Sequence, residues 1–217
     1  MEPGFWQDKW NNNEIGFHLD QVHPLLVRYW TTPPFLSARR IFVPLCGKTL
    51  DMHFLREQGA EVIGAELSGK AVTAFFAEAG VEPEVSEWSG GKCYRHDGIT
   101  LFQGDIFSLT QDQLGPVDAI YDRAAVIALP DSLRQQYVRH LLTLTARAPQ
   151  LLITLSYDQS QMPGPPFSVD AGNVQALYGD DYVITELAGA DILDHEPGFR
   201  ERGLTALAQH CWQLTPR

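Results

Sequence analysis

Four short stretches of this sequence carry residue types that could bind a small molecule, and each one comes at the end of an extended run. They are Gly47-Lys48-Thr49 after RIFVPL (40–45), Glu66 in EVIGAE (61–66), Asp105 in QGDIF (103–107), and Tyr121-Asp122-Arg123 in VDAIYDR (117–123). Ligands of open α/β sheets bind outside the carboxyl ends of the strands. We therefore expect all four stretches to lie at one edge of a parallel sheet.

The glycine turn narrows the choice of ligand. A phosphate-binding P-loop needs a glycine five residues before Gly47, and Phe42 occupies that position. A dinucleotide fingerprint needs three glycines, and this turn has only Gly47. A nucleoside without phosphate fits better, because Gly47 permits close approach of the backbone and Glu66 can accept hydrogen bonds from both ribose hydroxyl groups. This layout is typical of a site for S-adenosylmethionine.

The third and fourth stretches extend this interpretation. The Asp105 carboxylate could accept a hydrogen bond from the exocyclic amine of adenine, and Ile106 could cover a face of the adenine ring. Each assignment has a structural alternative. Taken alone, Glu66 is as typical of a solvated strand end as of a ribose ligand, and Arg123 could form a structural ion pair with Asp118 or Asp122. The order of the four stretches along the chain favours the binding site.

Extended and helical patterns alternate along the chain, which is typical of an α/β sheet. We expect strands at 40–45, 61–66, 117–123, 150–158 and near 182–187 and 207–215, and helices at 50–58, 68–80, from Asp131 or Ser132 onward, and at 173–179. Residues 92–105 hold two extended runs joined by Asp97-Gly98, a dipeptide suited to a tight hairpin. A proline-rich loop, MPGPPF (162–167), follows the strand at 150–158.

Composition and charge restrict the class of protein. A chain of 217 residues with 44% hydrophobic residues is long enough for one substantial core, so we expect one domain. A net charge of -11 disfavours nucleic acid and anionic membranes as partners. The start is unlike a signal peptide and no apolar run could cross a bilayer, so we expect a cytoplasmic protein. Cys46, Cys93 and Cys211 lack metal-ligand spacing, so we expect no metal.

Five stretches of the chain resemble the thiopurine S-methyltransferase family of class I methyltransferases. They are WQDKW (6–10), GFH (16–18), VPLCGK (43–48), YDRAA (121–125) and LSYDQSQMPGPPF (155–167). The resemblance implies a doubly wound, mostly parallel seven-stranded sheet with an inserted β-hairpin. It also implies a single domain over residues 1–217, with residues 1–24 as an amino-terminal lid. The start is shorter than in the animal enzymes of the family, which predicts a bacterial member.

The resemblance assigns roles to individual residues. On the cofactor side it places Trp10, Leu45, Gly47, Glu66, Asp105, Ile106 and Arg123. On the acceptor side it places Phe17, Pro163, Gly164 and again Arg123, which is the expected catalytic residue. The family has a further arginine near the acceptor. Both Arg200 and Arg202 match it, so neither is assigned.

The implied reaction is methyl transfer from S-adenosylmethionine to the sulfur of an aromatic or heterocyclic thiol such as a thiopurine, with selenium or tellurium species as further acceptors. Arg123 would favour the deprotonated acceptor. The alternatives are a halide or aliphatic thiol methyltransferase and a non-catalytic nucleoside-binding module. We expect a monomer whose partner is a small-molecule acceptor, with an amino-terminal segment that is mobile without cofactor.

Overall fold

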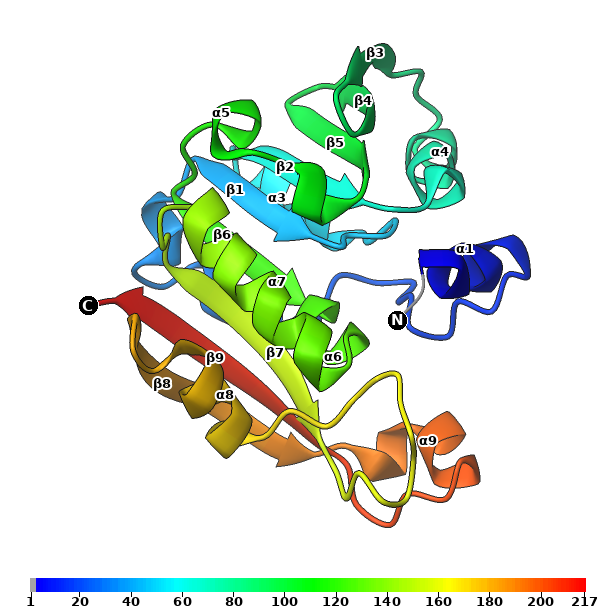
Figure 1. The fold of residues 1–217 in the computed structure, drawn as a ribbon, viewed down its shortest axis with the longest axis vertical. Helices are drawn as coiled ribbons and strands as arrows, with labels where there is room; N and C mark the ends of the chain where they lie inside the picture. The colour runs from blue at the N-terminus through cyan, green and yellow to red at the C-terminus, as the bar shows by residue number, and fades with distance from the viewer. Residues whose placement is uncertain (1–2) are drawn as a thin grey trace.

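The computed structural model describes residues 3–217, so the first two residues of the expected 1–24 lid lie outside it. Its centre is one nine-stranded sheet with the order β3-β4-β5-β2-β1-β6-β7-β9-β8 (Figure 1). The strands are β1 (Arg40–Pro44), β2 (Glu61–Glu66), β3 (Glu84–Trp88), β4 (Gly91–His96), β5 (Ile99–Gly104), β6 (Ala119–Arg123), β7 (Gln150–Ser156), β8 (Tyr182–Asp191) and β9 (Ala208–Pro216).

Seven of these strands form the expected doubly wound arrangement. Strands β5, β2, β1, β6 and β7 are parallel neighbours, and β9 lies antiparallel between β7 and β8. The expectation of seven strands was nevertheless too small, because β3 and β4 extend the same sheet beyond β5. The hairpin turn at Asp97-Gly98 is confirmed, with positive φ at both residues.

Strand β3 was not expected, and its residues explain why. Four of its five residues are exposed and only Trp88 is partly buried, so the strand has no buried face to leave an alternating pattern. It is held as an edge strand by backbone pairing with β4. Its position depends on a neighbouring strand rather than on its own hydrophobic residues.

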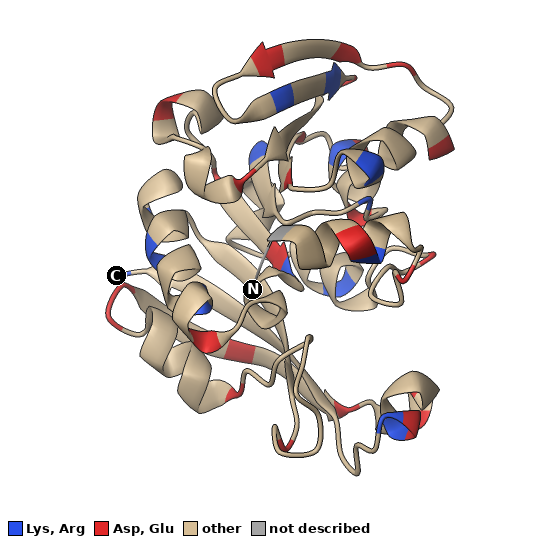
Figure 2. Cartoon of the chain, turned by 45° about the vertical axis from the view of Figure 1, so that its right-hand side comes forward, with Lys and Arg blue, Asp and Glu red and all other residues tan. Residues whose placement is uncertain are grey.

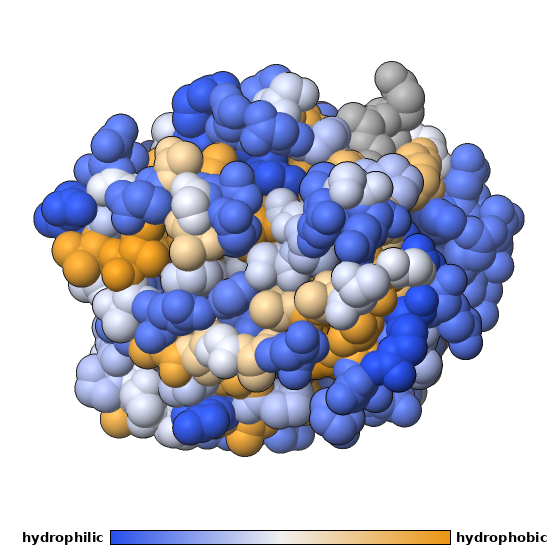
Figure 3. Space-filling view, turned by 90° about the horizontal axis from the view of Figure 1, so that it is seen from below, coloured by the Kyte–Doolittle hydropathy of each residue, from blue (hydrophilic) through white to orange (hydrophobic). Residues whose placement is uncertain are grey.

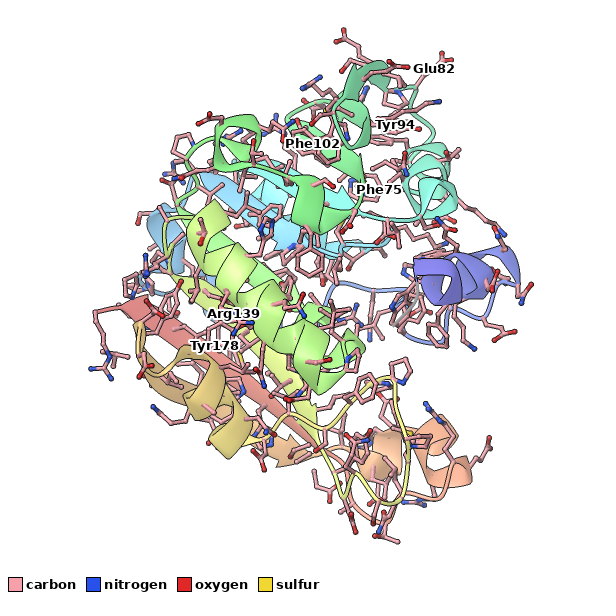
Figure 4. The ribbon with its side chains drawn as sticks, in the orientation of Figure 1. Phe75, Glu82, Tyr94, Phe102, Arg139 and Tyr178 are labelled. Atoms are coloured by element: carbon pink, nitrogen blue, oxygen red, sulfur yellow. The ribbon has the colours of Figure 1, made fainter. Side chains whose placement is uncertain are left out.

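Helices cover both faces of the sheet, and a large hydrophobic core lies on each face. They are α1 (Pro3–Asn11), α2 (Pro24–Trp30), α3 (Asp51–Glu57), α4 (Gly69–Glu78), α5 (Gln111–Leu114), α6 (Ala125–Ala128), α7 (Asp131–Leu144), α8 (Ala171–Tyr178) and α9 (Pro197–Glu201), with short 3-10 turns at Phe35–Ser37, Ile106–Ser108 and Leu193–His195. Helices α5 to α8 pack on one face, and α2, α3 and α4 pack on the other. Phe102 lies in the first core and Phe75 in the second, with Tyr94 packed against the second (Figure 4).

The amino-terminal segment lies at the edge where the parallel strands end. Helix α1 is on the side of α4, beyond the carboxyl ends of β1 and β2 (Figure 1). The Lys70 ammonium group of α4 donates a hydrogen bond to the Asn11 carbonyl at the end of α1, over 3.1 Å. The segment is therefore attached next to the strand ends that carry the candidate site residues.

Candidate active site

The four stretches singled out in the sequence meet at one edge of the sheet. Strands β5, β2, β1 and β6 are adjacent and parallel, so their carboxyl ends lie side by side. Glu66 is the last residue of β2 and Arg123 is the last residue of β6. Asp105 directly follows β5, and Gly47 lies three residues after the end of β1. The expected common edge is therefore present.

Glu66, at the end of β2, holds the turn that follows β1. Its carboxylate accepts a hydrogen bond from the Gly47 N–H at 2.8 Å and another from the Ser68 N–H at 2.7 Å. Burial raises the pKa of Glu66 above its ordinary value, and the N–H donors of Ser68 and Gly47 oppose that rise. A carboxylate has about four acceptor positions, so this one retains capacity for ribose hydroxyl groups. The interpretation of Glu66 as a solvated strand end is wrong, because only 6% of the residue is exposed.

Gly47 is needed for the shape of the same turn. Its φ is +54°, and a Cβ atom there would lie 3.1 Å from Trp10 Cζ2. Leu45 also has positive φ, at +46°, so the chain reverses sharply between β1 and α3. Leu45 and Gly47 are both partly exposed, and the lack of a side chain at Gly47 allows a nucleoside to approach the backbone of this turn.

The amino-terminal segment contributes a group of aromatic rings above this turn. Trp10 is 5% exposed, and its ring lies edge-on to Phe17 with the centroids 5.6 Å apart. Phe17 is also edge-on to Trp6 at 5.5 Å. The structure therefore joins Trp10 and Phe17, expected on the cofactor and acceptor sides, in one cluster next to Gly47.

Arg123 connects this cluster to the sheet. Its guanidinium Nη2 donates a hydrogen bond to the Phe17 carbonyl at 3.1 Å. No ion pair involves Arg123 within residues 3–217, so the structural alternative of a pair with Asp118 or Asp122 is not found there. Asp122 instead accepts a hydrogen bond from the Tyr137 hydroxyl, and Asp118 accepts from backbone N–H groups. The Arg123 charge is consequently available to a ligand.

Asp105 and Ile106 lie at the same edge but in different environments. Asp105 is exposed and caps a 3-10 turn by accepting the Phe107 N–H at 3.0 Å. Ile106 is only 5% exposed and belongs to the core under α7. Its carbonyl forms a 2.8 Å hydrogen bond with the His140 ring. Asp105 therefore offers a free carboxylate oxygen, whereas Ile106 offers only a small part of its side chain.

Pro163 and Gly164 belong to a loop that is fastened to the segment after Arg123. Gly164 has φ +81°, and a Cβ atom there would lie 2.6 Å from the Phe167 ring. The Phe167 N–H donates to the Ile127 carbonyl at 2.7 Å, which ties the loop to α6. The Tyr157 hydroxyl also donates to the Pro166 carbonyl at 2.6 Å. The loop is thus held near the carboxyl end of β6.

The two arginines that the sequence did not separate have different contacts. Arg202 donates a hydrogen bond to the Pro165 carbonyl of the loop at 3.2 Å. Arg200 instead pairs with the Asp194 carboxylate on the exposed surface. The sequence could not distinguish the two arginines, because they lie two residues apart in the same GFRERG stretch. Their contacts in the folded chain distinguish them.

Sequence reasoning missed Ser68 as part of the site. It was expected as the N-cap of α4, and its hydroxyl does accept the Ala71 N–H at 3.3 Å. Its own N–H, however, donates to Glu66, and a backbone donor carries no residue-type signal. The Glu66-Leu67-Ser68 spacing, an acid two residues before an N-cap, is the one clue in the sequence.

Charged residues are distributed around this edge without a basic face. Lysines and arginines lie scattered among acidic residues in the view of Figure 2. Arg123 is therefore distinguished by its position rather than by a surrounding positive patch.

No helix within residues 3–217 has the length and apolar character needed to cross a membrane.

Comparisons with known proteins show the family of this chain. The family model described as Thiopurine S-methyltransferase (TPMT) matches residues 1–217. The chain is 45% identical to a Thiopurine S-methyltransferase of Pseudomonas fluorescens over 99% of both chains, and 45% identical to one of Xanthomonas campestris over the same shares.

Solved structures show the fold. The magnesium protoporphyrin IX methyltransferase of Synechocystis PCC 6803, solved with bound SAH, superposes with a TM-score of 0.64 at 14% identity, covering 99% of this chain and 100% of that one. A SAM-dependent methyltransferase from Anabaena variabilis gives 0.63 at 14% identity, covering 99% and 95%. The fold is that of a class I methyltransferase and S-adenosylmethionine is the methyl donor. From its whole-length match and its 45% identity to curated relatives, the chain belongs to the thiopurine S-methyltransferase family.

Proposed function

We propose that this enzyme transfers the methyl group of S-adenosylmethionine to the sulfur of aromatic or heterocyclic thiols such as thiopurines. The observation that carries the proposal is the placement of Arg123. Its guanidinium lies at the end of β6, contacts the aromatic amino-terminal segment through the Phe17 carbonyl, and has no acidic partner within residues 3–217. A cation in that position can attract and orient an anionic acceptor.

The proposed cofactor side uses the turn after β1 and the ends of the next two strands. Glu66 accepts the ribose hydroxyl groups, and the backbone at Leu45 and Gly47 approaches the cofactor closely. Trp10 packs over the turn from the lid. Asp105 and Ile106 lie at the end of β5, where the adenine would be bound, and Arg123 contributes from β6.

The proposed acceptor side is formed by Phe17, Arg123 and the loop with Pro163 and Gly164. Arg202 joins them through its contact with Pro165. S-adenosylmethionine supplies an electrophilic methyl group, so the protein has to align the acceptor and exclude water. The positive charge of Arg123 favours the thiolate form of the acceptor, which contributes about 1 to 3 kcal/mol when the pair is desolvated. Selenium and tellurium species are further proposed acceptors, because their anions are also soft nucleophiles.

We further propose a monomeric, single-domain enzyme of the cytoplasm in which residues 1–24 act as a lid. The large exposed hydrophobic side chains lie on separate elements, namely Val27, Leu36, Val85, Phe107 and Val183. On the face shown in Figure 3, hydrophobic residues form small groups between hydrophilic ones.

Cys46, Cys93 and Cys211 are free and buried, which fits a reducing compartment.

The test is single-turnover methyl transfer from labelled S-adenosylmethionine to a thiopurine, an aromatic thiol, an aliphatic thiol, iodide and selenite. Arg123→Ala is expected to reduce the chemical step, and Glu66→Ala to weaken cofactor binding. Arg95→Ala is the matched control, because Arg95 lies on the hairpin and its side chain donates, within residues 3–217, only to the Ser86 hydroxyl. Transfer to iodide or selenite alone would reject the thiol assignment. Full thiol activity in Arg123→Ala would reject the role of Arg123.

A further inference from the structure

A buried carboxylate contacts Tyr121, two residues before Arg123 on β6, and belongs to none of the groups described above. Asp51, the first residue of α3, is 1% exposed. Its Oδ1 accepts the backbone N–H of His23 at 2.7 Å, and its Oδ2 accepts the Tyr121 hydroxyl at 2.9 Å. It therefore joins the start of α2 to strand β6 across 28 and 70 residues of sequence.

Tyr121 relates this carboxylate to the active-site arginine. Tyr121 and Arg123 are two residues apart on β6, so their side chains leave the same face of the sheet. Arg123 holds the Phe17 carbonyl, and Tyr121 holds His23 through Asp51. Strand β6 thus fastens the segment from Phe17 to His23 at both of its ends.

We propose that Asp51 is a positioning residue that fixes the amino-terminal segment on β6 and thereby sets the orientation of Arg123 toward the methyl acceptor. This inference rests on the proposed function, because it requires Arg123 to act on the acceptor. Asp51 itself is buried and acts through Tyr121 and His23. Its role is distinct from that of Glu66, which faces the cofactor side from β2.

The two hydrogen bonds are what makes the burial of this carboxylate tolerable. No ion pair involves Asp51 within the part of the chain that the structure describes. The His23 ring supplies no positive charge near pH 7, since burial and the Arg123 charge lower its pKa to about 4. A buried carboxylate without a cation depends on its hydrogen-bond donors. Asp51, His23 and Tyr121 should therefore behave as one unit.

Loss of this unit releases one end of the 17–23 segment. Within residues 3–217, the Arg123 guanidinium donates its hydrogen bond to the Phe17 carbonyl. Movement of the segment therefore changes where that guanidinium points. Misplacement of a catalytic group by about 1 Å can lower a rate by up to about 100-fold. The effect should fall on the step that uses Arg123 and leave the cofactor turn at Glu66 intact.

Tyr121→Phe tests this with minimal change, because it removes only the hydroxyl donor to Asp51. With a thiopurine as acceptor, we expect kcat to fall about 10-fold while the Kd for S-adenosylhomocysteine stays within about 2-fold. Amide hydrogen exchange in residues 17–23 should become faster. Tyr182→Phe is the matched control. Tyr182, on β8, is fully buried and its hydroxyl donates to the Ala148 carbonyl at 2.9 Å. Loss of that hydroxyl should leave kcat and the hydrogen exchange of residues 17–23 unchanged.

A double-mutant cycle separates positioning from a general structural effect. If Tyr121 acts through Arg123, then Tyr121→Phe should lower kcat much less in the Arg123→Ala background than in the wild type. Equal reductions in both backgrounds would overturn the inference while leaving the role of Arg123 intact. An Arg123→Ala enzyme with full activity would overturn the proposed function and this inference together.

Asp51 itself offers a second variant pair. Asp51→Asn can still accept the His23 N–H and can donate to the Tyr121 oxygen, whereas Asp51→Ala can do neither. We expect Asp51→Asn to retain most of the kcat that Asp51→Ala loses. Equal losses in these two variants, or a wild-type kcat in Tyr121→Phe, would contradict a positioning role.

Discussion

The Glu66 carboxylate and the Gly47 N–H lie 2.8 Å apart, which joins the end of β2 to the turn after β1. Ser68 adds a second donor to the same carboxylate at 2.7 Å. Glu66 therefore has two tasks, because it shapes the backbone of the turn and presents its remaining acceptor positions to the cofactor.

Glu66→Gln should weaken cofactor binding. An amide has one acceptor oxygen in place of the carboxylate pair, so a backbone donor or a ribose hydroxyl must lose its partner. A lost hydrogen bond to a charged group corresponds to a Kd for S-adenosylhomocysteine that rises about 10-fold to 100-fold. Isothermal titration calorimetry measures it. Glu61→Gln, at the exposed start of the same strand, should bind like the wild type, and equal affinities in all three proteins would reject Glu66 as a cofactor ligand.

Gly47→Ala should damage both the turn and the lid. Alanine at φ +54° costs about 1 to 2 kcal/mol of stability, and its Cβ would press against Trp10. Gly59→Ala is the matched control, since Gly59 has φ +87° and open space around its Cβ position. Both variants should unfold at lower denaturant concentration. Only Gly47→Ala should also lose cofactor affinity, and a similar loss in Gly59→Ala would show that backbone strain alone accounts for the effect.

The aromatic amino-terminal segment should become ordered when cofactor binds. Phe17 joins Trp6 and Trp10 next to Gly47, and hydrogen bonds from Lys70 and Arg123 attach this segment to α4 and β6. Hydrogen exchange in residues 5–18 should slow on addition of S-adenosylhomocysteine, while exchange in the hairpin at 91–104 should not change. Unchanged exchange in 5–18 would count against a lid.

Arg202 and Arg200 should differ in their effect on the acceptor. Arg202 contacts the loop at Pro165, so Arg202→Ala should raise KM for a thiopurine about 5-fold without altering the Kd for S-adenosylhomocysteine. Arg200→Ala removes only the surface pair with Asp194 and should leave both constants unchanged. Steady-state kinetics at saturating cofactor distinguish the two. A larger effect from Arg200→Ala would reverse the assignment.

His23 should make stability depend on pH between about 4 and 6.5. Burial and Arg123 lower its pKa to about 4 in the folded protein, against the opposing effect of Asp51, whereas the unfolded chain has the ordinary value of about 6.5. Between these values the unfolded chain binds more protons, so the contribution of His23 is complete above pH 6.5 and is lost as the pH falls. The total is at most about 3 kcal/mol.

His23→Asn tests this without removing the cap of α2, because asparagine can also accept the Leu25 N–H. Urea unfolding at pH 7.5 and pH 4.5 should show a smaller loss of stability in the variant than in the wild type. His96→Asn, in the exposed hairpin, provides the same substitution as a control. Identical losses in His23→Asn and the wild type would mean that His23 does not carry the dependence.

Much of the fold could be predicted because its strands and helices are marked locally. The buried strands read as apolar runs, Ser68 and Gly59 mark helix ends, and Asp97-Gly98 marks a hairpin. Strand β3 lacked such a mark because most of its side chains face solvent, so only pairing with β4 makes it a strand. A sheet edge formed by backbone hydrogen bonds leaves little trace in residue type.

The residue pattern along the chain predicts where the central parallel strands end, and in a parallel sheet that order alone places Gly47, Glu66, Asp105 and Arg123 at one edge. Tertiary structure decided the contacts that depend on distant segments meeting. These are the Gly47 donor to Glu66, the choice of Arg202 over Arg200 at the loop, and the burial of Asp51 between His23 and Tyr121. The physical reason is that strand order follows from local pattern, whereas a hydrogen bond between residues 70 positions apart depends on the packed positions of both.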